Sequence, residues 1–109
     1  MEKITNLKDY NIYSGLGGSF GGASYIGTLQ NTDEEEASNY AFEEACNIYE
    51  SYEGLHGLRT TTDIINDEGV DEDEAWEIYI EERENWLDYY AIPTEEDTSL
   101  TEEDLIVLN

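Results

Sequence analysis

The chain has 109 residues and a formal net charge of -24, with 28 acidic residues against 4 Lys and Arg. This charge repels phosphate and so argues against binding nucleic acid directly or an anionic membrane surface, and it favours a basic protein partner. The length fits one domain, and nine Tyr and two Trp supply the large side chains that a thin core needs.

The N-terminal sequence MEKITNLKDY lacks the apolar core of a signal peptide, and no apolar run approaches the roughly 18 to 20 residues of a membrane span. We therefore expect a cytoplasmic protein. The single cysteine, Cys46, has no intrachain disulfide partner. Because it stands among apolar positions of helical spacing, we expect it to be a small core residue.

The first thirty residues are neutral, and they predict an antiparallel β-hairpin. Strands are expected at residues 9–16 and 23–29, where apolar and polar positions alternate, with the glycine-rich segment 17–22 as the connection. The segment GLGGSFGG could suggest a phosphate loop, but no Lys-Ser/Thr pair follows it and the next element reads as a strand. We interpret it as a flexible hairpin tip, or as a partner-contacting loop around Phe20.

The remainder of the chain predicts helices. Asn31, Thr32 and Asp33 offer an N-cap, and small apolar residues then recur at helical spacing until Gly54 or Gly57. Residues 60–62 can cap a short helix that Gly69 closes.

A longer helix is predicted over residues 70–90, with Pro93 as its stop. Its apolar stripe places Trp76 and Trp86 in the core and Arg83 at the edge, where the guanidinium can meet a carboxylate or an aromatic face. The predicted fold class is α+β, with two longer helices and one short helix packed on a small antiparallel β-sheet.

The domain is expected to comprise residues 1–93, followed by an acidic, mostly mobile tail at 94–109. The apolar residues 105–108 would add an edge strand to the sheet, dock on the core, or remain loose.

Sequence motifs for catalysis or metal binding fail on detail. Residues 63–74 resemble a calcium loop, but Gly69 falls one place late and Ile65 occupies a ligand position. His56, the only histidine, is interpreted as a turn or packing residue. Since the carboxylates look uniformly exposed, no pair of them is set apart as acid and base. We predict no cofactor, no metal and no enzymatic activity. A metal-dependent hydrolase that uses clustered carboxylates is the remote alternative to a noncatalytic binding protein.

Acid density is the strongest functional signal. The helix predicted at 70–90 carries nine acids over an axis of about 30 Å, or about one net charge per 4 Å, against about 3.4 Å per phosphate on one DNA strand. Further acidic clusters lie at 33–36, 95–97 and 102–104. The expected partner-binding residues are Asp71, Glu72, Asp73, Glu74, Glu77, Glu81, Glu82, Glu84, Asp88, Asp33, Glu34, Glu35, Glu36 and Glu53. The alternative is a solvated helix face that only confers solubility.

Four segments resemble the opening part of ArdA-type antirestriction proteins, which are phage- and plasmid-borne DNA mimics. They are YNIYSGLGGSFGG, ASYIGTL, NTDEEE and YESYEGLHGLR, within residues 10–59. The last is similar to the family's Asp-Tyr-Glu-Gly segment through Tyr52, Glu53 and Gly54, with Ser51 in the place of Asp. The family's tryptophan in the second strand is replaced by Tyr25 or Ile26. The chain also resembles small acidic proteins of tailed phages.

The resemblance implies a phage anti-defence protein that occupies the basic DNA- or RNA-binding channel of a host restriction or CRISPR nuclease, in the host cytoplasm. The alternative is a noncatalytic acidic adaptor that binds a basic protein other than a nuclease, such as a virion or transcription component. A homodimer is possible in either case.

Overall fold

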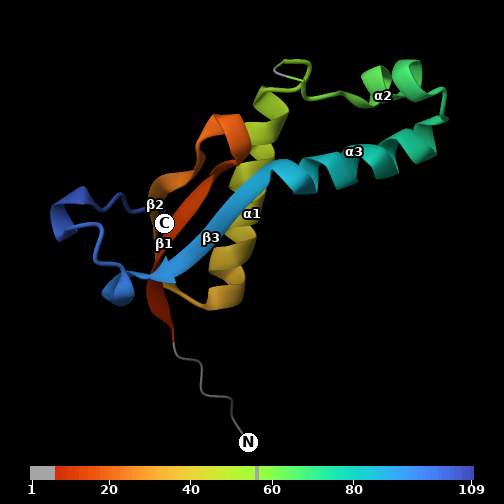
Figure 1. Ribbon diagram of the computed structural model, residues 1–109. Helices are drawn as coiled ribbons and strands as arrows, with labels where there is room; N and C mark the ends of the chain where they lie inside the picture. Colours follow the sequence, from red (N-terminus) through yellow and green to blue (C-terminus); the bar gives the residue numbers. More distant parts are fainter. Residues whose placement is uncertain (1–6, 56) are drawn as a thin grey trace, which may run out of the picture.

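The computed structural model describes residues 7–55 and 57–109, so the interpretation of His56 lies outside the described residues. The fold is α+β, with an antiparallel sheet in the order β2-β1-β3 (Figure 1). The strands are β1 (Lys8–Leu16), β2 (Gly22–Thr32) and β3 (Leu87–Pro93), and the helices are α1 (Glu34–Ser51), α2 (Thr61–Glu68) and α3 (Glu72–Trp86). Within the described residues, no helix has the length and apolar character needed to cross a bilayer.

The N-terminal hairpin forms as predicted, with β1 and β2 antiparallel and Leu16 opposite Gly22. Its tip is less free than expected, because the backbone N–H of Gly17 donates to the carbonyl of Trp86 over 2.8 Å. Gly18 has a φ of +61°, and a Cβ there would lie 3.1 Å from the indole of Trp86. The ring of Phe20 also meets that indole edge to face. The tip is therefore anchored to the end of α3.

The third strand corrects the predicted extent of the long helix. Instead of running to Tyr90, α3 ends at Trp86, and β3 pairs with the other edge of β1, from Leu16 opposite Leu87 to Tyr10 opposite Pro93. The tyrosine-rich segment suits a strand as well as a helix, and pairing satisfies the backbone groups that would otherwise line an open edge of β1. The central position of β1 explains why its residues 10–16 are all buried.

Helix α1 covers one face of the sheet, as Figure 1 shows. Three alanines on its inner side, at 37, 41 and 45, are fully buried, and their small size lets the helix approach the sheet closely. The hydroxyl of Ser14 donates to the carbonyl of Ala41 over 2.7 Å. Cys46 is buried, which confirms the expectation of a core residue, and this burial raises the pKa of its thiol.

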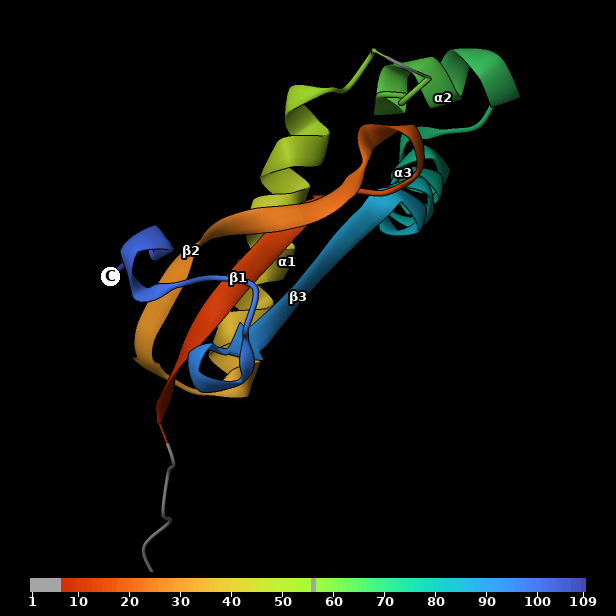
Figure 2. The ribbon, with the colours of Figure 1, turned by 60° about the vertical axis from the view of Figure 1, so that its left-hand side comes forward.

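The C-terminal segment 94–109 lies against the opposite face of the sheet and along β2 (Figure 2). Asp97 accepts hydrogen bonds from Asn11 Nδ2 at 3.0 Å and from Tyr13 OH at 2.6 Å. Farther on, Leu108 N donates to Thr28 O over 2.9 Å. Of the three alternatives for residues 105–108, the edge strand is represented by one isolated parallel bridge between Thr28 and Val107. The segment is thus held at two places.

Helices α2 and α3 pack on each other and project from the sheet as an arm, which we define as residues 58–83 (Figure 1). Thr60 and Asp63 form a capping box at the start of α2, and Gly69 ends the helix at a φ of +68°, as predicted. Ile64 and Ala75 are fully buried in the arm. Since α2 covers only one side of α3, the side that carries Asp73, Glu77, Glu81 and Glu84 faces solvent.

The two tryptophans separate along α3, which contradicts the prediction that both lie in the core. Trp86 is half-buried against the hairpin tip, whereas Trp76 is 52% exposed. The spacing that places both on an apolar stripe is real, but the arm has no third layer to cover the side of α3 that carries Trp76.

Candidate functional site

Four exposed acids, Asp73, Glu77, Glu81 and Glu84, form a row on the outer face of α3. They are spaced four, four and three residues apart, so they lie on one side of the helix, at steps of about 6, 6 and 4.5 Å along its axis. Ala75 and Tyr79 occupy the opposite, buried side. We call these four residues the acidic stripe; the exposed Glu72 and Glu74 flank its beginning.

The cations of the described chain are all engaged away from the acidic stripe. Lys8 Nζ pairs with Glu95 at 3.2 Å on the far side of the sheet. The guanidinium of Arg83 lies over two rings, 5.7 Å from the centroid of Tyr79 and 5.9 Å from that of Phe42. Its position at the edge of the apolar side agrees with the helical spacing. No ion pair within the described residues therefore neutralises the stripe.

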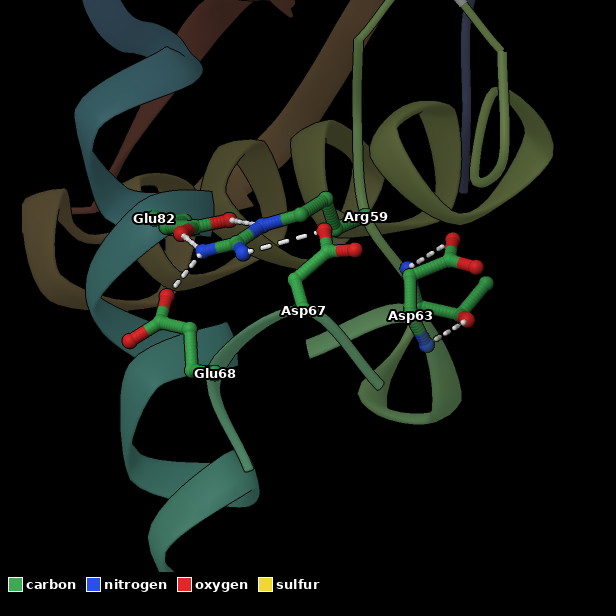
Figure 3. A network of polar contacts seen from close by, with 6 residues as sticks. Arg59, Asp63, Asp67, Glu68 and Glu82 are labelled. Carbon is green, nitrogen blue, oxygen red and sulfur yellow. Dashed lines mark hydrogen bonds and ion pairs between the residues drawn. The ribbon is translucent and has the colours of Figure 1, made fainter. Parts of the chain in front are cut away.

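Arg59 joins three carboxylates of the arm (Figure 3). Its guanidinium bonds to Asp67 at 3.3 Å, to Glu68 at 2.7 Å and to Glu82 on α3. These bonds, the one with Glu82 foremost, raise the pKa of Arg59 above its ordinary value. Glu82 thus ties α3 to the segment before α2, and we leave it out of the acidic stripe.

Several other predicted partner-binding acids serve as helix caps. Asp71 accepts from the backbone N–H of Glu74 at 2.9 Å, and Asp33 accepts from that of Glu36 at 2.8 Å. A carboxylate at an N-cap satisfies an otherwise free donor and interacts favourably with the helix dipole. Glu36 in turn accepts from the hydroxyl of Thr32 at 2.8 Å. These acids stabilise helix starts whatever the partner is.

Glu53 and Asp88 also make contacts within the fold. Glu53 accepts a hydrogen bond from the phenol of Tyr79; burial first, and then this bond, raise the pKa of Tyr79. Asp88 lies in β3 rather than on the helix, and it accepts from the backbone N–H of Ala23 at 2.8 Å. Both carboxylates connect elements that are distant in the sequence.

The predicted cluster at 33–36 is not brought near the acidic stripe. It sits at the start of α1, whose 18 residues span about 27 Å, whereas the arm meets the other end of that helix through Tyr49 and Tyr79 (Figure 1). Glu34 and Glu35 are exposed at that distant end. The acids therefore form separate surfaces, one of which is the acidic stripe on α3.

Trp76 is the functional candidate that sequence reasoning missed. Its ring stacks on Tyr79, with centroids 5.3 Å apart and planes 16° apart, while half of the residue stays exposed. One turn earlier on α3 lie Glu72 and Asp73, both exposed acids. These two acids, four and three positions before Trp76, are visible in the sequence and indicate that Trp76 lies where the apolar side of α3 meets its polar side.

Two findings describe the metal-ligating and thiol groups of the described residues. No group of three or more His, Cys, Asp or Glu side chains there is arranged to hold a metal ion. The Cys46 thiol is buried with a raised pKa, which disfavours the reactive thiolate. What the surface offers is a fixed row of carboxylates beside an exposed aromatic ring.

Comparison of the chain with protein-family models, with curated proteins and with solved structures gives no match. The resemblance to ArdA-type proteins therefore stays a prediction.

Proposed function

We propose that the protein is a noncatalytic inhibitor that mimics nucleic acid and occupies the basic DNA- or RNA-binding channel of a host restriction or CRISPR nuclease. The observation that carries this proposal is the acidic stripe, whose four carboxylates share one helix face without a cationic partner in the described chain. Solubility alone requires neither this alignment nor a net charge of -24.

The charge spacing supports mimicry of a phosphate backbone. When Glu72 and Glu74 are included, six exposed acids lie along about 18 Å of axis, or about one per 3 to 4 Å. One strand of B-DNA carries a phosphate about every 3.4 Å. Lys and Arg side chains that line a nucleic-acid channel would thus meet oxyanions at a comparable linear density.

The rigid helix also favours α3 over the other acidic surfaces. Carboxylates on a folded helix have already lost most of the freedom that a disordered acidic chain would lose on docking. The arm projects from the sheet, which gives α3 access to a recessed channel (Figure 1). The carboxylates of Asp33, Glu82 and Asp88 already accept hydrogen bonds within the fold, so they are less available to a partner.

The test is competition with nucleic acid. Purified restriction and CRISPR nucleases, loaded with a fluorescent DNA duplex or guide RNA, are titrated with the parent protein and with a variant carrying Asp73→Asn, Glu77→Gln, Glu81→Gln and Glu84→Gln. We expect the parent to displace nucleic acid from a nuclease, and the variant to require at least about tenfold more protein, equivalent to about 1.4 kcal/mol.

The matched control removes four exposed acids of α1 instead, through Gln at Glu34, Glu35, Glu43 and Glu50. Its net charge equals that of the stripe variant, so a loss confined to the stripe variant reports position rather than total charge. Binding that leaves the nucleic acid in place would contradict mimicry and favour an acidic adaptor. Equal losses in both variants would contradict the role of α3.

A further inference from the structure

We infer that Trp76 is a docking point for an arginine of the basic partner, whose guanidinium stacks on the exposed indole while Glu72 or Asp73 accepts its N–H groups. This inference rests on the proposed function, since the arginine belongs to the protein whose basic surface meets the acidic stripe. It adds a preference among cations that a row of carboxylates does not have by itself.

The ring of Trp76 is both ordered and accessible. Its stacking on Tyr79, at 5.3 Å and 16°, fixes the orientation of the indole, and 52% of the residue remains exposed. A ring that is already ordered loses little conformational entropy when a ligand covers it. Tryptophan is also the aromatic side chain that attracts cations most strongly.

Two exposed carboxylates, Glu72 and Asp73, stand one turn before Trp76 on α3. Long side chains of a helix lean toward its N-terminus, so we expect the indole of Trp76 to lean toward the turn that bears these two acids. A planar guanidinium can then combine ring stacking with a charge-assisted hydrogen bond to a carboxylate one turn away. Both acids are exposed, and neither has an ion-pair partner among the described residues.

The protein already uses the same pairing internally. The guanidinium of Arg83 lies 5.7 Å from the centroid of Tyr79, the ring on which Trp76 stacks. Trp76, Tyr79 and Arg83 thus form a row along α3, with a cation at its inner end and an open ring at its outer end. An arginine from a partner would extend this row.

Charge and shape select the occupant. A second copy of this chain would bring another net charge of -24 to the surface, and a nucleic-acid base would bring phosphates with it. A lysine ammonium is a compact, strongly hydrated charge that cannot stack as a plane, whereas a guanidinium can. The surface therefore fits an arginine of a basic protein.

The experiment measures binding of fluorescein-labelled deca-arginine and deca-lysine by anisotropy at fixed salt. We expect the parent to prefer deca-arginine by about three- to tenfold. Trp76→Leu should weaken deca-arginine binding until the two peptides differ by less than about twofold, with deca-lysine unchanged, and Trp76→Phe should restore part of the preference. Tyr90→Leu is the matched control, because Tyr90 is exposed on β3, away from the stripe.

A parent without arginine preference would overturn the inference, as would a preference that survives Trp76→Leu in protein of unchanged circular dichroism. The contribution of the acidic stripe is measured separately with Glu77→Gln, Glu81→Gln and Glu84→Gln combined, which should weaken the binding of both peptides alike and keep their ratio. A Trp76-dependent preference in a protein that displaces no nucleic acid would sustain the inference and contradict mimicry.

Discussion

The body of the molecule, formed by the sheet and α1, and the arm, formed by α2 and most of α3, treat their acidic residues differently. In the body, Asp97 and Asp88 accept hydrogen bonds from the sheet and from the hairpin backbone. In the arm, the inner acids converge on Arg59, while the acidic stripe faces solvent without a cation. The body thus bonds these carboxylates through neutral donors, whereas the arm bonds its inner carboxylates through one guanidinium.

The tryptophans show the same contrast on a single helix. Trp86 stands where α3 joins the body, and the hairpin tip covers it through Gly18 and Phe20. Trp76 lies in the arm and contacts Tyr79 with one ring face. The difference lies in the elements around α3, since the body offers a sheet and α1, whereas in the arm α2 covers one side and α1 contacts only the Tyr79–Arg83 end.

The largest expected effect is in the core of the body. Ile12 is fully buried in the central strand against α1, so Ile12→Ala should lower the free energy of unfolding by about 2 to 5 kcal/mol. Urea unfolding followed by circular dichroism measures this loss. Ile106→Ala, at a residue 55% exposed, is the control and should stay within about 0.5 kcal/mol of the parent. Equal losses would contradict the position of the core.

A smaller effect is expected from the charge network of the arm. Arg59→Gln leaves Asp67, Glu68 and Glu82 facing one another without a cation, so the melting temperature should fall. Because salt screens the remaining repulsion, the deficit should shrink between about 0.1 and 1 M NaCl, as the Debye length falls from about 10 to 3 Å. A melting temperature equal to the parent's would mean that the arm does not need this bridge.

The contact of Asp97 with the sheet should appear as a pH dependence. Hydrogen bonds from Asn11, Ser99 and Tyr13 hold the pKa of Asp97 well below its usual range. A lowered folded-state pKa stabilises the protein above the unfolded-state pKa of about 3.9, and this contribution is lost as the pH falls toward the folded-state value. Asp97→Asn should therefore be less stable than the parent at pH 7, with the gap narrowing below about pH 4. A gap independent of pH would contradict this linkage.

The smallest effect is expected at the exposed tryptophan. Trp76→Ala removes one stacked ring pair, worth about 0.5 to 1.5 kcal/mol beyond the apolar area that the contact covers, and half of the indole is already in solvent. Trp86→Ala should cost more, because it also removes packing against Phe20 and the hairpin tip. Thermal melts of the two variants compare the ends of α3 directly, and a larger loss at Trp76 would mean that the arm covers that residue.

Local signals in the sequence determined the helix starts, the hairpin and the identity of the acidic surface. The caps at Asp33 and Thr60 and the stop at Gly69 depend on hydrogen bonds between residues three or four positions apart, so a short window contains the whole interaction. The same holds for the acidic stripe, since spacings of four and three residues place its members on one helix face in any fold that keeps the helix.

Tertiary structure alone decided the third strand, the docked tail and the roles of single acids. Residues 87–93 suit both a helix and a strand, and the free edge of β1, more than seventy positions earlier, selected the strand. Glu82 pairs with Arg59, 23 positions away, and so does not belong to the acidic stripe. Trp76 is exposed because no further helix or strand covers its side of α3. These outcomes depend on which segments, distant in the sequence, pack against each other. The free energies of strand pairing and burial between such segments cannot be read from the spacing of residues within one segment.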